Sequence, residues 1–247
     1  MDVLVAVKRV PITGGRIVLS DDAQAIDTRH LGFTISPHEE CATEEAVRLV
    51  EAHGGVSTVL TLGPPEAQEQ LRDALAIGMD DAIHLVIGEE EWDPQATAAA
   101  IVAAVRLAPR RYDLILFGNE SADAGNFQVA ARVAHALGLP FVTGVKALSI
   151  DGPSVRCEQE VAGGRDVYVL PLPAVLAVKE GINLPRYPSV PGRLRAKRKP
   201  LEASSPERPQ ARLEKLSLRL PPGAGKQVAI LDGADAVVGV LDELGLL

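Results

Sequence analysis

Runs of apolar residues alternate along the first half of the chain with segments whose apolar positions recur every three or four residues. Residues 3–7 form a continuous apolar run, which is typical of a strand buried on both faces. Strands of this type alternating with helices indicate βαβ units, so the predicted fold class is α/β with a doubly wound, mostly parallel sheet. The other predicted strands cover residues 56–62, 82–87 and 113–118, and the predicted helices begin near residues 36, 66, 93 and 126.

The first predicted helix has a well-marked start and end. Ser36 is a good N-cap, and Pro37 suits the first turn because its missing N–H would have no acceptor within the helix. Glu39 stands at the third helical position, where its carboxylate can complete a capping box with Ser36. Gly54 and Gly55 follow the last apolar position and are expected to end the helix.

From residue 144 onward the pattern changes to short alternating runs that are typical of antiparallel strands. Gly-containing turns separate these runs, so we expect an antiparallel extension of the sheet. The runs cover residues 145–150, 155–161 and 166–170, with turns at 151–153 and 163–164. A further apolar strand is expected at 174–178, and a smaller hairpin is expected from residues 16–19 and 23–26.

Residues 183–200 form a proline-rich segment with six basic side chains and no acidic one. Its prolines fix φ, remove N–H donors and favour extended conformations before them, so we expect a loop that becomes neither helix nor central strand. Val190 stands between two of the prolines. A stiff loop that presents an apolar side chain beside positive charge is suited to docking on a partner, but a solvated linker explains the composition equally well. The prolines are Pro185, Pro188 and Pro191.

The composition changes again after residue 200. Residues 202–210 are rich in Ser, Pro and Glu and are expected to be a linker without a core of its own. Residues 227–247 regain apolar positions at helical spacing, and a short amphipathic helix on such a linker is expected to pack on another chain. The predicted organisation is an α/β nucleotide-binding domain at 1–182, a recognition loop at 183–200, and a linker with a C-terminal arm at 201–247.

Composition narrows the function classes. The net charge of -8 argues against a general nucleic-acid binder, so the basic segment favours a specific acidic protein surface instead. The two cysteines have no CxxC spacing, which argues against a disulfide framework or a zinc site and fits a reducing compartment. The apolar run at the N-terminus is too short to span a membrane and is expected to be a buried strand.

A ligand crevice is expected between the carboxyl ends of the first and fourth predicted strands, where the strand order of such a sheet reverses. The loop at residues 118–129 follows the fourth strand, is rich in Gly, Ser, Asp and Asn, and leads into a helix. Exposed N–H groups at that helix start would suit a phosphate. On these residues alone, an ordinary capped loop is slightly favoured over a phosphate site.

No catalytic or metal centre is predicted. Residues 223–226 lack the first Gly and the final Ser or Thr of a phosphate loop, and the chain has no GxGxxG. Residues 38–41 combine His, Glu and Cys, but adjacent positions on a helix point in different directions. The other histidines form no spaced cluster.

Several motifs together resemble a known family. The stretch Leu184-Pro185-Arg186-Tyr187-Pro188, followed by Val190-Pro191 and the basic run at 196–199, is similar to the signature of electron transfer flavoprotein β subunits. The loop at 118–129 resembles the AMP-binding pattern of that family: Gly118, Asp123 and Gln128 are kept, and Gly125 replaces a second Asp. The resemblance covers most of the chain and implies the adenine-nucleotide α-hydrolase-like form of the fold.

The resemblance also implies roles for individual residues. Glu160 would help to position the mobile flavin domain, although an exposed strand residue explains it equally well, and Thr13 stands where the family often has a Tyr near the flavin. The implied AMP-binding residues are Ala6, Ser36, Pro37, His38, Glu39, Leu62, Gly118, Asp123, Ala124, Gly125, Asn126, Phe127, Gln128 and Val129. The implied partner-binding residues are Tyr187, Val190, Pro191, Arg193, Leu194, Arg195 and Lys197.

The function implied by the resemblance is electron transfer by a heterodimer. FAD would be held mainly by the α subunit and AMP by this chain, with electrons passing from acyl-CoA dehydrogenase-type flavoenzymes to a membrane quinone reductase. The chain would be an electron-carrier subunit of the bacterial cytoplasm, or of the mitochondrial matrix in a eukaryote. Two alternatives are a bifurcating β subunit with a second FAD in place of AMP, and a nucleotide-binding protein that works alone.

Overall fold

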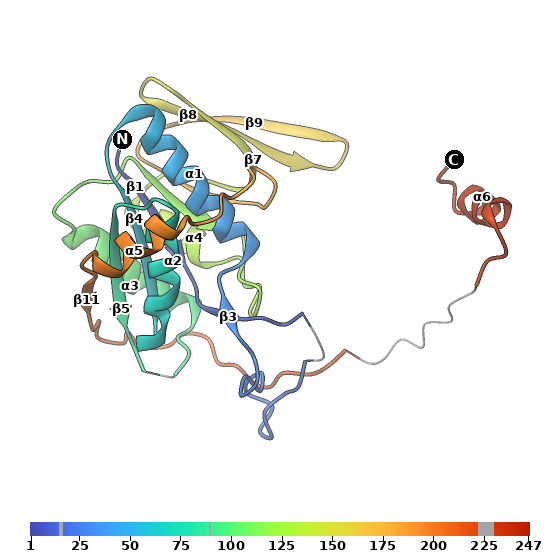
Figure 1. The fold of residues 1–247 in the computed structure, drawn as a ribbon, viewed down its shortest axis with the longest axis horizontal. Coiled ribbons are helices and arrows are strands. Elements are labelled where there is room, and N and C mark those ends of the chain that lie inside the picture. Colours follow the sequence, from blue (N-terminus) through green and yellow to red (C-terminus); the bar gives the residue numbers. More distant parts are fainter. Residues whose placement is uncertain (15–16, 89, 222–229) are drawn as a thin grey trace.

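The computed structural model describes residues 1–14, 17–88, 90–221 and 230–247, and its centre is a nine-stranded sheet (Figure 1). Seven neighbouring strands, from β11 to β7, run parallel, which confirms the predicted α/β class. In spatial order the strands are β11 (Glu202–Ser204), β5 (Asp81–Val86), β4 (Ser57–Gly63), β1 (Val3–Val7), β6 (Leu114–Gly118), β10 (Ala174–Val178), β7 (Phe141–Asp151), β8 (Ser154–Val161) and β9 (Gly164–Pro171).

Helices cover both faces of the parallel sheet, so the fold is doubly wound as predicted. Strand β1 shows why: Val3 and Val5 pack in the core on the side of α1 and α2, while Leu4 packs in the core on the side of α3 and α4. All five residues of β1 are buried, as its continuous apolar run predicted. The helices are α1 (Pro37–His53), α2 (Gln68–Ile77, after the 3-10 turn Pro65–Ala67), α3 (Pro94–Leu107) and α4 (Val129–Leu137).

The antiparallel extension is also confirmed. Strands β7, β8 and β9 form a meander at one end of the sheet, and Gly152 and Gly163 have positive φ in its two turns. The chain then returns to β10, which lies between β6 and β7 and is parallel to both.

The proline-rich segment differs from its prediction. The expectation that residues 183–200 contain no helix is wrong, because α5 spans Val190–Arg198. Ser189 is the N-cap and its hydroxyl accepts a hydrogen bond from the N–H of Gly192, while Pro191 occupies the first turn, where no N–H is needed. Within this segment, residues 183–189 and 199–200 lie outside the helix.

The segment after residue 200 differs as well. Glu202–Ser204 form β11, which pairs in parallel with β5, so the expectation of a linker from residue 202 is wrong for its first residues. The expected C-terminal helix is present as α6 (Ala234–Glu243), but none of its residues is buried, and Figure 1 shows it away from the sheet. Residues 223–226 and the start of the predicted arm at 227 lie outside the described residues.

A short two-stranded sheet stands beside the main one. Strand β2 (Val10–Pro11) pairs antiparallel with β3 (Phe33–Thr34). The hairpin predicted between them is reduced to a single bridge from Leu19 to Ile26, and residue 16 lies outside the described residues. Across the described ranges, the structure contains no helix with the length and apolar character needed to cross a membrane.

Candidate functional site

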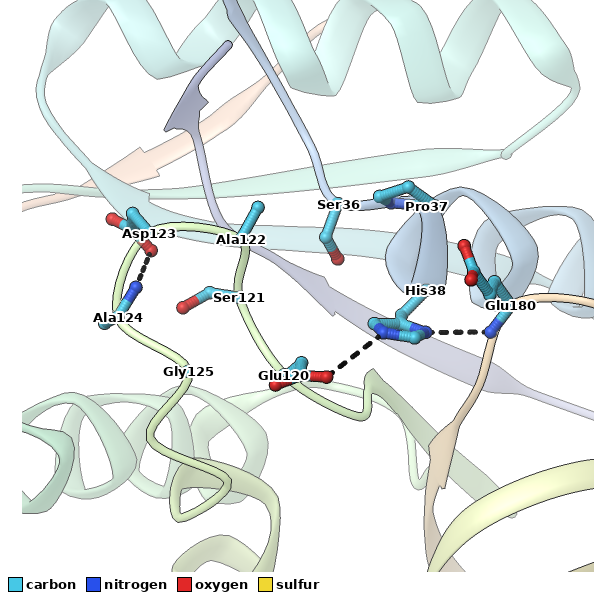
Figure 2. A pocket seen from close by; sticks show the side chains of 10 residues that line it. All are labelled: Ser36, Pro37, His38, Glu120, Ser121, Ala122, Asp123, Ala124, Gly125 and Glu180. Carbon is cyan, nitrogen blue, oxygen red and sulfur yellow. Dashed lines mark hydrogen bonds and ion pairs between the residues drawn. The ribbon is translucent and has the colours of Figure 1, made fainter. Parts of the chain in front are cut away.

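A pocket of about 370 Å³ opens at the carboxyl edge of the sheet (Figure 2). Strand order reverses between β1 and β6, which places the predicted crevice there. Three chain segments build the walls: the first turn of α1, the loop after β6 and the start of the loop after β10. The lining residues are Ser36, Pro37, His38, Glu120, Ser121, Ala122, Asp123, Ala124, Gly125 and Glu180.

The first turn of α1 is fixed to the end of β1 by one carboxylate. Glu39 accepts a hydrogen bond from the N–H of Ser36 at 2.8 Å, completing the predicted capping box, and its other oxygen accepts from the N–H of Lys8 at 2.8 Å. Gly118, at the end of β6, packs on the same side chain: a Cβ at this position would lie 2.6 Å from Cγ of Glu39. The close packing of the end of β6 on the first turn of α1 therefore requires glycine at 118.

Burial gives Glu39 an unusual titration. Removal from water raises the pKa of its carboxyl group from 4.5 to about 7, and the N–H groups of Ser36 and Lys8 limit the rise. Between these two values the folded chain binds a proton that the unfolded chain does not. Stability is therefore highest at the acidic end of this window and falls as the pH rises toward 7.

We expect the free energy of unfolding to fall by up to about 3 kcal/mol between roughly pH 5 and 7.5, and Glu39→Gln to remove most of that decline. Urea unfolding of both proteins at the two pH values measures the effect. The change in the free energy of unfolding between the two pH values is compared for the two proteins. The difference between these changes isolates residue 39 from other titrating groups. An equal change in the free energy of unfolding in the two proteins would contradict the assignment to Glu39.

His38 connects the three walls of the pocket. Its Nδ1 accepts a hydrogen bond from the N–H of Glu180 at 2.8 Å, and its Nε2 lies 3.5 Å from Oε1 of Glu120 (Figure 2). Because Nδ1 is the acceptor, the proton of the neutral ring belongs on Nε2, where it points to Glu120. The first turn of α1 is thereby joined to both loops.

Lys8 supplies a cation beside the pocket. Its Nζ lies 2.7 Å from Oδ2 of Asp123 and 3.3 Å from Oε1 of Glu91. Burial alone would raise the pKa of Asp123, but the ammonium of Lys8 holds it below its usual value. Lys215, from the segment after β11, pairs with the same Glu91 at 2.6 Å. This charge network fixes the loop after β6 to the end of β1.

The structure brings part of the predicted AMP site together. Ser36, Pro37, His38, Asp123, Ala124 and Gly125 line one pocket. Ala6 and Glu39 are buried, Gly118 packs against Glu39, and the remaining predicted residues do not line the pocket. Those remaining residues are Leu62, Asn126, Phe127, Gln128 and Val129.

Sequence reasoning missed Lys8, Glu120 and Glu180. The signal for Lys8 was its place directly after the first strand, at the carboxyl edge. Glu180 had a similar signal, two residues after β10, but only the sheet order shows that this end of β10 lies beside β6.

The pocket is suited to a small polar ligand with one anionic group. Its volume lies at the small end of the range for ligand pockets, roughly 300–1,000 Å³. The N-terminal end of α1 favours an anion, whereas Glu120, Asp123 and Glu180 disfavour a highly charged polyphosphate and can accept hydrogen bonds from hydroxyl or amino groups. These residues fit a nucleoside monophosphate. Among the described residues, no three His, Cys, Asp or Glu side chains are placed so that they could hold a metal ion together.

The predicted partner-binding residues lie on a separate surface. Tyr187 is 96% exposed and Val190 is 72% exposed. The extended part of the segment is held against α1 by Arg186, which pairs with buried Glu44 at 2.9 Å and with Glu51 at 2.6 Å. Hydrogen bonds to Glu51 and Glu44 raise the pKa of Arg186. The segment is therefore held in place and its apolar side chains are displayed to solvent.

The helix that follows packs on α2. Arg72 donates to the carbonyl oxygens of Ala196 and Lys199, and Nζ of Lys199 donates to the carbonyl of Met79 at 2.9 Å. Arg193 lies 3.7 Å from Asp73. The other predicted partner-binding residues on α5 are Pro191, Leu194, Arg195 and Lys197.

The acid singled out in the meander does not line the pocket, but its neighbour Lys146 donates to the carbonyl oxygen of Glu180 at 2.7 Å. Glu160 is on β8, with its side chain 59% exposed and 3.9 Å from Nζ of Lys146.

Comparisons with known proteins agree with the resemblance in the sequence. Residues 25–209 match the model of the electron transfer flavoprotein domain. The chain is 37% identical to the electron transfer flavoprotein subunit beta of Bacillus subtilis, over 82% of this chain and 78% of the relative. It is 35% identical to the protein of the same name from Syntrophomonas wolfei, over 98% and 95%, and 32% identical to that from Bradyrhizobium diazoefficiens, over the full length of both. The chain therefore belongs to the electron transfer flavoprotein family, among its beta subunits.

Proposed function

We propose that this chain is the β half of a heterodimeric electron carrier and holds AMP as a structural ligand. FAD is held mainly by the α subunit, so this chain makes and breaks no bonds itself. Electrons arrive from acyl-CoA dehydrogenase-type flavoenzymes and leave toward a membrane quinone reductase. The place of action is the bacterial cytoplasm, or the mitochondrial matrix in a eukaryote.

The observation that carries the nucleotide proposal is the pocket between the first turn of α1 and the loop after β6. The N-terminal end of α1 attracts the phosphate, and the carboxylates of Glu120 and Glu180 accept hydrogen bonds from ribose hydroxyls or the adenine amino group. The interactions of His38 with Glu180 and Glu120 keep the walls in place before the ligand arrives. A bound AMP would therefore tie three segments of the chain together.

The docking proposal rests on the exposed segment around α5. Val190 is the apolar anchor, and Arg193, Arg195 and Lys197 attract an acidic surface of the dehydrogenase. Exposed charges act mainly on the association rate, whereas a buried apolar anchor acts mainly on the dissociation rate. Glu160 lies on the meander away from this segment and has the proposed role of positioning the flavin domain.

Nucleotide extraction tests the proposed function. The chain is purified as a complex with its α subunit, denatured, and its released nucleotides are separated by chromatography. We expect one AMP and one FAD per complex. Two FAD and no AMP would indicate the bifurcating alternative, whereas a chain that purifies alone with a nucleotide would indicate a protein that works without a partner.

A pocket-filling variant ties the AMP to this site. Ala124 is exposed in the wall of the pocket, so Ala124→Trp is expected to abolish retention of AMP while FAD content stays the same. Ala136→Trp is the matched control, because Ala136 is exposed on α4 outside the pocket. Unchanged AMP content in Ala124→Trp would contradict the assignment of this pocket.

A further inference from the structure

Arg9 is a cation for which the described part of the chain offers no anion. It lies two residues after β1, at the same edge of the sheet as the pocket, and its guanidinium centre lies 3.4 Å from the centroid of the Phe33 ring. Its Nε is buried and has no hydrogen-bond partner, and no ion pair among the described residues includes it. The side chain as a whole is half-buried.

Other half-buried arginines of this chain are satisfied. Arg72 donates to two backbone carbonyls, Arg132 donates to the side chains of Gln95 and Gln128, and Arg110 pairs with Asp81 at 3.1 Å. A guanidinium stays charged at every accessible pH, so partial burial without an acceptor costs free energy. Arg9 is the exception to a pattern that the rest of the chain follows.

The surroundings of Arg9 are suited to an interface. Strands β2 and β3 have two residues each, and so small a two-stranded sheet has little stability alone. Ile12, next to β2, is 50% exposed. Stacking on Phe33 fixes the plane of the guanidinium and leaves the N–H groups in that plane for a bidentate acceptor.

We propose that Arg9 binds a carboxylate of the flavin-carrying partner subunit, which rests on the proposed function above. A carboxylate matches the planar fork of the guanidinium and carries one charge. The diphosphate of FAD, with two charges, would need a second free cation, and Lys8, which precedes Arg9 in the chain, already pairs with Asp123 and Glu91. Arg9 is therefore an anchor for subunit assembly, separate from the nucleotide pocket and from the docking segment around α5.

The test measures the stability of the co-purified heterodimer. Its Kd is determined by dilution at several NaCl concentrations for the wild type, Arg9→Gln, Arg9→Lys and Arg111→Gln. Arg111 is an exposed arginine just before β6, at the opposite edge of the sheet, so its variant removes the same charge away from the proposed site. We expect Arg9→Gln to raise the Kd about ten- to hundredfold and to reduce its salt dependence. Arg9→Lys keeps the charge and loses the planar fork, so its Kd is expected to lie between those of Arg9→Gln and the wild type. The Kd of Arg111→Gln is expected to match that of the wild type.

Three outcomes separate the possible failures. An unchanged Kd and salt dependence in Arg9→Gln would overturn the inference. If the Kd of Arg9→Gln is higher only in the FAD-loaded complex, and not after FAD has been stripped, Arg9 binds the cofactor phosphates. That result would overturn the proposal that Arg9 binds a carboxylate of the partner subunit. A wild-type chain that forms no complex with a flavin-carrying subunit would contradict the proposed function instead. If Arg9→Gln does not fold, Arg9→Lys provides the test. Its Kd should be higher than that of the wild type, while the salt dependence of the Kd should stay close to the wild-type value. An unchanged Kd in Arg9→Lys would overturn the inference.

Discussion

Replacing Arg186 by Met is expected to destabilise the chain by about 3 kcal/mol, because it leaves the carboxylate of Glu44 buried without its main partner. Glu44 is only 3% exposed, and Arg186 reaches it with both a side-chain pair at 2.9 Å and a backbone N–H at 3.1 Å. Arg48 lies 3.8 Å away and offers partial compensation. Urea unfolding measures the loss. Under the docking role proposed above, electron transfer from an acyl-CoA dehydrogenase-type enzyme should fall as well, because the segment is no longer held on α1.

Two further variants isolate the cause. Combining Arg186→Met with Glu44→Gln removes both charges and should recover much of the lost stability, since a buried pair costs most when one partner is left alone. Val190→Asp, at a residue 72% exposed, should leave stability nearly unchanged and, under the proposed docking role, should lower coupling to the dehydrogenase. An Arg186→Met chain that unfolds like the wild type would show that the pair does not hold the segment.

Gly192→Ala is expected to separate α5 from α2, at a cost of about 2 kcal/mol. A Cβ on Gly192 would lie 2.5 Å from the carbonyl oxygen of Ala76 and 3.1 Å from the hydroxyl of Ser189. The first contact is with backbone, which cannot rotate away, and the second would disturb the N-cap of α5.

The control for this substitution is another helical glycine. Gly239 lies inside α6, and a Cβ there would meet nothing within 4 Å, so Gly239→Ala should be neutral or slightly stabilising. Thermal unfolding compares the two variants, and the coupling assay tests whether the displaced α5 still docks. Equal melting temperatures for both variants would contradict the close packing of α5 on α2.

The parallel core could be predicted from the sequence because burial on both faces leaves a continuous apolar run, as in β1 and β10. The sequence does not predict α5, because three prolines in and just before it are typical of a segment without helix. Pro191 in fact sits in the first turn, and the last carbonyls of the helix are satisfied by Arg72, which is distant in sequence. Strand β11 has three exposed residues and no apolar signal, so only its pairing with β5 defines it.

In the candidate site too, features that depend on neighbouring residues could be predicted, whereas contacts between distant segments could not. The start of α1 was predictable because the capping box is a local signal carried by Ser36 and Glu39. The connection from His38 to Glu180 spans 142 residues and depends on the order of the strands, which no local pattern carries. The pairing of Arg186 with Glu44 is of the same kind.

The outer edge of the meander has a practical consequence for anyone producing this chain. Strand β9 ends the sheet, and Val167 and Val169 on it are 50% and 65% exposed. An edge strand with free backbone donors and acceptors and apolar side chains is a template for another strand. A chain made in excess of its companion is therefore expected to be lost to strand-to-strand aggregation, and balanced synthesis of the two polypeptides should raise the yield even though the core of the single chain is well packed.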